Sequence, residues 1–69
     1  MSQVEADARA LMDEFTLADF LGVAVQTVRK WRWQRSGPSF VKTGRLVRYR
    51  LADVEAWLDR QTVPSREVA

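Results

Sequence analysis

Apolar residues near the start of the chain recur at the spacing of a helix. Counted from position 4, they lie at offsets of 0, 4, 7, 8 and 11, which are Val4, Ala8, Leu11, Met12 and Phe15. This period predicts an N-terminal helix over residues 1–15. Two roles stay open for such a helix: it covers the core of the domain that follows, or it docks on a neighbouring copy of the chain.

A second, shorter helix is predicted directly after the first. Thr16 has the chemistry of an N-cap, and Asp19 three residues later completes a variant of the capping box. Gly22 ends this helix, because glycine tolerates the left-handed conformation that closes many helices. The apolar stripe between the two ends consists of Leu17, Phe20 and Leu21.

The next helix is expected over residues 24–35, where Ser36-Gly37-Pro38 stops it. At about 100° per residue, one side of this helix is apolar and the opposite side is polar and basic with one large aromatic residue. The inward positions are Ala24, Val25, Val28 and Trp31, and the outward positions are Gln26, Arg29, Lys30 and Trp33.

Two short strands are predicted over residues 39–42 and 45–50, on either side of Thr43-Gly44 as a two-residue hairpin turn. This pairing sets Lys42 opposite Arg45, so that two cations face each other at the tip. Because side chains alternate along a strand, the core side of the hairpin is predicted to carry Phe40, Val47 and Tyr49.

A last helix is predicted over residues 52–61, and residues 62–69 are expected to form a disordered tail. The apolar face of this helix consists of Val54, Trp57 and Leu58. The fold class expected is mainly α with a small β-hairpin. It is a winged helix-turn-helix over residues 16–61, with an extra helix over residues 1–15.

The composition excludes several kinds of function. A chain of 69 residues is one domain, and it has no cysteine and no histidine, which rules out a zinc finger. We therefore expect no metal, no cofactor and no enzymatic activity. No apolar run approaches the roughly 20 residues that span a membrane, so we expect a cytoplasmic protein without membrane contact.

Charge is segregated along the chain. Residues 24–50 carry eight cations and no acid, whereas residues 1–23 carry five acids and one arginine. A solvated surface normally mixes both signs, so the basic stretch indicates a surface that binds a polyanion.

Within the basic stretch and the helix before it, the spacing of small and apolar residues is that of a helix-turn-helix. Ala18, Gly22 and Val28 fall at offsets of 0, 4 and 10. The small residue lets the second helix approach, the glycine makes the turn, and Val28 with Trp31 packs the second helix on the first. The hairpin after it predicts a wing on the flanking DNA backbone.

The outward face of the second helix has base-reading chemistry, because Gln suits adenine and Arg or Lys suits guanine. Trp33 has three possible roles: packing beneath the wing, a thymine-methyl or sugar contact, or a partner contact. Arg48 and Arg50 either contact DNA or protect an edge strand. The residues expected to contact DNA are Gln26, Thr27, Arg29, Lys30, Trp33, Lys42, Thr43, Gly44, Arg45 and Arg48.

These motifs resemble those of phage excisionases, over about residues 14–60. The run 25–31 (VQTVRKW) resembles their recognition helix, 41–45 (VKTGR) their wing, and 48–58 (RYRLADVEAWL) their closing helix. Excisionases are related to the DNA-binding domain of MerR-type regulators.

The resemblance implies a recombination directionality factor, bound to the nucleoid of the phage host. Such proteins bind direct repeats in double-stranded DNA near an attachment site, associate along the DNA, bend it, and direct a phage integrase towards excision. The resemblance places Gln26, Lys30 and Trp33 over bases and Arg45 at the minor groove. Trp33 departs from the family pattern, in which a polar or basic residue is usual.

Two alternatives remain. One is a small winged-helix transcriptional regulator, and the other is an adaptor or antitoxin that binds protein through the tryptophan-rich surface. DNA binding predicts an affinity that falls steeply with salt, whereas the adaptor predicts an affinity that salt leaves unchanged.

Overall fold

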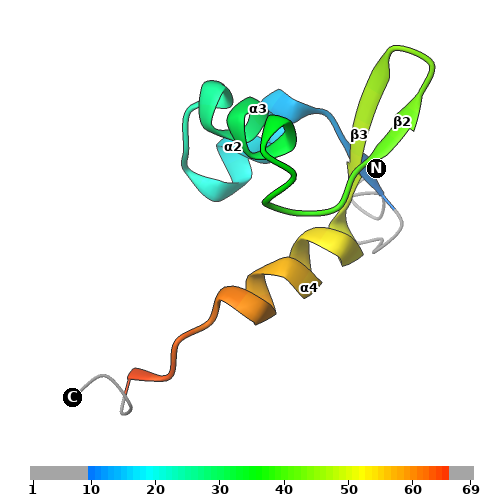
Figure 1. Cartoon of the computed structure of the whole chain (residues 1–69). Helices are drawn as coiled ribbons and strands as arrows, with labels where there is room; N and C mark the ends of the chain where they lie inside the picture. The colour runs from blue at the N-terminus through cyan, green and yellow to red at the C-terminus, as the bar shows by residue number, and fades with distance from the viewer. Residues whose placement is uncertain (1–9, 66–69) are drawn as a thin grey trace.

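The computed structural model describes residues 10–65, which form three helices and a three-stranded antiparallel sheet (Figure 1). The pair α2–α3 is a helix-turn-helix, and the hairpin β2–β3 is a wing beside it. The predicted winged helix-turn-helix is therefore confirmed. In chain order, the elements are β1 (Leu11–Met12), α2 (Glu14–Leu21), α3 (Val25–Trp33), β2 (Val41–Thr43), β3 (Leu46–Arg50) and α4 (Leu51–Gln61).

The helix predicted over residues 1–15 is wrong for the part that the structure describes, and residues 1–9 lie outside the described residues. Leu11 and Met12 form β1, which pairs with β3 so that Leu11 lies opposite Arg50. The helical spacing misleads here because β3 offers an unpaired row of backbone donors and acceptors on the side away from β2. Strand β1 satisfies part of that row and completes the sheet order β1-β3-β2.

The start of α2 lies earlier than the sequence predicts. Asp13, not Thr16, is the N-cap, and its carboxylate accepts a hydrogen bond of 2.8 Å from the Thr16 backbone N–H. Aspartate is the stronger of the two capping residues, and that hydrogen bond lowers the pKa of Asp13. At the other end, Gly22 closes the helix at φ +72°, as predicted.

The hairpin turn lies one residue further along the chain than predicted, at Gly44-Arg45. Lys42 therefore pairs with Val47, and the predicted pair Lys42–Arg45 does not form. The reason is conformational, since Gly44 with φ +62° takes the first central position of the turn. Because the turn is shifted by one residue, the partner of each residue on the opposite strand changes by two positions. Side chains alternate along a strand, so each one stays on its predicted face of the hairpin. Tyr49 is buried accordingly.

The core lies where α2, α3, β3 and α4 meet. Its fully buried members are Leu17, Ala18, Val28, Tyr49 and Val54. Three aromatic residues that the sequence assigned to apolar stripes or to the core side are instead exposed, namely Phe15, Phe20 and Phe40. The core is thus smaller than the apolar pattern predicts, as expected for a domain of this size.

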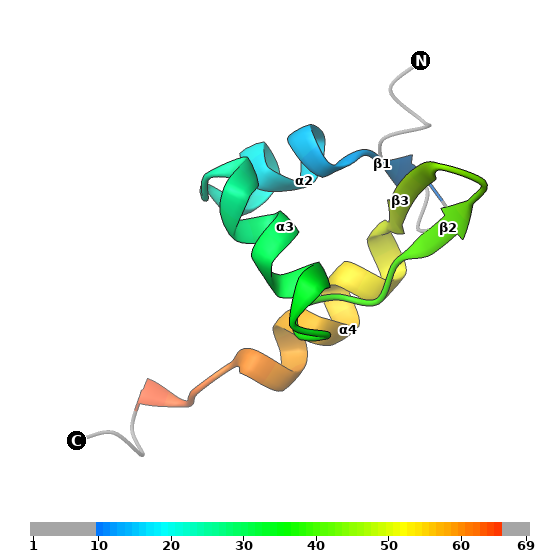
Figure 2. The same cartoon turned by 45° about the horizontal axis from the view of Figure 1, so that its top comes forward.

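Helix α4 lies beside the end of α3 (Figure 2), and Trp57 of α4 packs on Trp31 of α3. The rings of Trp31 and Trp57 lie 5.1 Å apart at 51°, a tilted aromatic pair. The loop after α3 passes close to Trp31. A Cβ at Gly37, where φ is +80°, would lie 2.9 Å from the Trp31 Cβ. The loop can therefore cross here only without a side chain at position 37.

We expect Gly37→Ala to destabilise the fold more than Gly44→Ala does. Both glycines have positive φ, which costs about 1 kcal/mol for alanine. Only position 37 adds a clash, worth about 1–3 kcal/mol, because nothing lies within 4 Å of a Cβ at Gly44. Urea unfolding followed by circular dichroism measures both variants. Equal losses would show that the loop moves away from Trp31 without cost.

Candidate nucleic-acid interface

One face of α3 carries a set of exposed side chains with polar, basic and aromatic character. Gln26, Arg29, Lys30 and Trp33 are all exposed, whereas Val28 on the opposite side is buried. Thr27, the fifth residue expected on this helix, is half-buried at the edge of the face. The structure therefore brings together the four outward side chains that the sequence placed there.

Trp33 is the most exposed large apolar residue among residues 10–65, at 90% of its full surface. The possibility that its indole packs beneath the wing is therefore wrong. An indole at the last position of α3 lies in solvent, and contact with DNA or with a partner remains as its role.

Arg29 is exposed, but its guanidinium already donates hydrogen bonds to another residue of the protein. Its Nε and Nη2 donate hydrogen bonds of 3.1 and 2.7 Å to Glu14 Oε2, from the first turn of α2. Its guanidinium also lies 5.5 Å from the centre of the Phe15 ring, a cation–π contact. Since 47% of the side chain stays exposed, the arginine is held in a set position at the surface.

Arg32 is the residue that sequence analysis missed. Its Nη1 donates to the hydroxyl of Tyr49 at 3.1 Å and its Nη2 to Glu14 Oε1 at 3.2 Å. These bonds connect α3 to β3 and to α2. The signal was present in the sequence, because Arg32 falls beside Val28 on the inward side of the helix. A cation there needs partners.

At the wing, the residues expected to contact DNA lie together and are exposed. They are Lys42, Thr43, Gly44 and Arg45. Arg48 differs, because it is half-buried and its Nη1 donates to the carbonyl oxygen of Val47 at 2.8 Å. Its charge also contributes to the lowered pKa of Asp13. Arg48 thus lies at the base of the wing, next to the start of α2.

Acidic residues from other parts of the chain form ion pairs with some of the cations in the basic stretch (residues 24–50). Glu14 pairs with Arg29 and Arg32, and Asp53 pairs with Arg50 at 3.1 Å. Within residues 10–65, the cations of the stretch that form no ion pair are Lys30, Arg35, Lys42, Arg45 and Arg48. These residues extend from the exposed face of α3 to the wing. They carry the positive charge of this surface that no described acidic residue neutralises.

The described residues contain neither a group of histidine, cysteine and acidic side chains suited to a metal ion nor a helix long and apolar enough to cross a membrane. A family model described as a helix-turn-helix domain matches residues 16–62 of the chain. The match includes most of α2 and all of α3, the wing and α4. A search of curated proteins finds no match.

The ion pairs of Glu14 predict a pH dependence of stability. Arg29 above all, with Arg32 beside it, holds the pKa of Glu14 below its ordinary value of 4.5. A carboxylate with a lowered folded-state pKa stabilises the fold fully above the unfolded-state value, and this contribution is lost as the pH falls through the lower value. We expect Glu14→Gln to weaken the fall in unfolding free energy on acidification below about pH 4.5.

The matched control is Glu55→Gln on α4, because Glu55 is exposed and forms no ion pair with any described residue. The free energy of unfolding of wild type, Glu14→Gln and Glu55→Gln is measured by urea unfolding at a series of pH values from neutral to acid. Curves for wild type and Glu14→Gln that run parallel across this range would mean that the ion pairs add nothing to stability.

Proposed function

The chain belongs to the helix-turn-helix domain family. We propose that it is a sequence-specific DNA-binding protein that acts as an excisionase. The observation that carries the proposal is the exposed face of α3. On a buried framework of Val28 and its neighbours, this helix presents an amide and two cations outward. A helix of this kind fits the major groove, where such groups read base edges.

The exposed polar and charged side chains assign different DNA contacts to α3 and to the wing. Gln26 and Lys30 are exposed on α3, and Lys30 forms no ion pair with any described residue, so the two side chains can bond adenine and guanine edges. Arg45 at the hairpin turn is the wing residue best placed to reach a phosphate or the minor groove. Arg29, held by Glu14, and Thr27 serve as the flanking contacts.

The recombination role rests on the resemblance of the recognition helix, wing and closing helix to those of excisionases. In this role the chain performs no catalysis, since an integrase cuts and joins the DNA. A single module buries about 600–1,000 Å² on DNA, which is small for specific binding among genomic competitors. We therefore propose that several copies bind direct repeats side by side and bend the DNA between them.

We expect Gln26→Ala and Lys30→Ala to relax base preference at defined positions. Each loses an edge contact worth about 1–3 kcal/mol on the selected site and loses less on random DNA. The measurement is a competition binding assay, with a site obtained by selection from random duplexes. Arg45→Ala is the contrasting variant. It should weaken binding to both duplexes and lower the slope of log affinity against log salt by about one.

Equal losses on selected and random DNA for the two α3 variants would remove the base-reading assignment. An unchanged salt slope for Arg45→Ala would mean that the wing does not reach phosphate. A wild-type affinity that salt leaves unaltered would favour the adaptor function over DNA binding altogether.

The recombination role is tested with the integrase encoded nearest to the gene for this chain. We expect the purified chain to bend a duplex that carries two selected sites, to bind the second site more tightly than the first, and to stimulate excision while inhibiting integration. A fluorescence-labelled duplex reports the bend, and an excision assay on a plasmid reports the recombination. Repression of a promoter without any effect on either reaction would identify the chain as a transcriptional regulator instead.

A further inference from the structure

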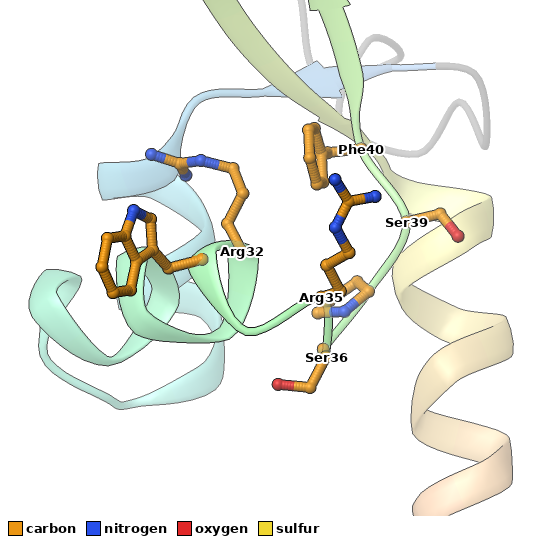
Figure 3. A pocket seen from close by; sticks show the side chains of 8 residues that line it. Arg32, Arg35, Ser36, Ser39 and Phe40 are labelled. Carbon is orange, nitrogen blue, oxygen red and sulfur yellow. The ribbon is translucent and has the colours of Figure 1, made fainter.

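A hollow of about 650 Å³ lies between the end of α3 and the loop that leads into β2. Figure 3 shows Arg32 on one side of it and Arg35 with Phe40 on the other. The residues around it that bear on binding are Arg32, Trp33, Arg35, Ser36, Ser39 and Phe40. The hollow thus joins the recognition helix to the base of the wing.

Two aromatic side chains line the hollow and are exposed to solvent. The Trp33 indole is 90% exposed, although its burial would be favourable by a few kcal/mol at about 25 cal/mol per Å². Phe40 is 40% exposed and packs on Tyr49, with ring centres 6.0 Å apart. The other two indoles pack on each other, so in residues 10–65 Trp33 is the tryptophan left open for a ligand.

Arg35, a cation in the lining of the hollow, is held in a strained backbone. Arg35 has φ +57°, in the left-handed region where glycine is favoured by about 1 kcal/mol or more. Its N–H donates to the Arg32 carbonyl at 3.2 Å, and the Ser36 N–H donates to the Trp31 carbonyl at 2.8 Å. These two bonds form the motif that ends α3. Here the chain keeps an arginine where a glycine would be more stable.

The hollow complements an anion, because two arginines and two serines line it and no acid does. Arg32 is already bonded to Tyr49 and Glu14, whereas Arg35 forms no ion pair with any described residue. Arg35 is therefore the group that is free to bind the anion. Exposed aromatic faces and a free guanidinium in one hollow suit a ligand that has both an apolar ring and a negative charge.

We propose that the hollow binds one sugar-phosphate unit of the DNA strand that passes from the recognition helix to the wing. Arg35 bonds the phosphate, and the face of Trp33 packs on the deoxyribose. The occupant is DNA rather than an acidic protein segment because Trp33 also belongs to the exposed face of α3. A duplex along that face reaches the hollow without a break. This inference rests on the proposed function.

The test uses the full chain with two duplexes, the selected site and a random sequence. Trp33→Ala should weaken binding to both by the same factor, about tenfold, because a sugar contact carries no sequence information. Phe20→Ala, which removes a 54% exposed aromatic side chain on α2 outside the hollow, should leave binding unchanged. The fluorescence difference between wild type and Trp33→Phe isolates the Trp33 indole, which should change its emission when either duplex is added.

Arg35 allows a variant whose stability and binding move in opposite directions. Arg35→Gly relieves the left-handed strain and should raise the melting temperature, yet weaken DNA binding and lower the salt slope by about one. A misfolded protein could not produce that combination. Arg60→Ala on α4 removes the same charge outside the hollow and should leave the slope unaltered.

Each other outcome overturns the proposal. If wild type binds duplexes and the Trp33 and Arg35 variants bind them equally well, the hollow takes no part, although the proposed function stands. If Trp33→Ala weakens binding to the selected site alone, the indole reads a base. If its emission changes with protein concentration in the absence of DNA, the hollow receives a second copy of the chain. If wild type binds no duplex, the proposed function itself fails.

Discussion

A half-buried arginine connects the recognition helix to the rest of the domain. Arg32 lies on the inward side of α3, where an unpartnered guanidinium would be costly, and among residues 10–65 its partners are Tyr49 and Glu14. Rotation of α3 about its axis, or sliding along it, would break both bonds. The direction in which the exposed face points relative to the wing is therefore set by a polar contact, in a domain whose apolar core has only a few buried side chains.

The sequence predicts the parts of this fold that depend on local chemistry. Gly22 marks the turn and Val54 the inward face of the last helix, because a left-handed glycine and a helical apolar stripe are local signals. The inward positions of Val47 and Tyr49 on the hairpin were also correct, although its turn was placed one residue too early. The errors arise where a distant segment decides. Residues 11 and 12 form a strand only because β3 lies beside them, and no property of their own spacing shows this.

The candidate site follows the same rule. The outward set on α3 could be found from helical angles alone, and the structure places it there. What the angles could not show is which cations are occupied. Arg29 and Arg32 share Glu14, from a segment fifteen or more residues earlier, so their charge is partly neutralised in space. Positive charge along a sequence is therefore an upper limit on the positive charge that a ligand meets.

The sheet has a consequence for solubility. In the order β1-β3-β2, the longest strand is in the middle, and the two strands at the edges have two and three residues. One of those edges carries the exposed Lys42. Short, charged edges offer few unpaired backbone groups to another chain, which discourages edge-to-edge aggregation. In the assembly proposed above, copies on neighbouring sites of one DNA molecule would meet at high local concentration, and these short edges would offer them little backbone to pair through.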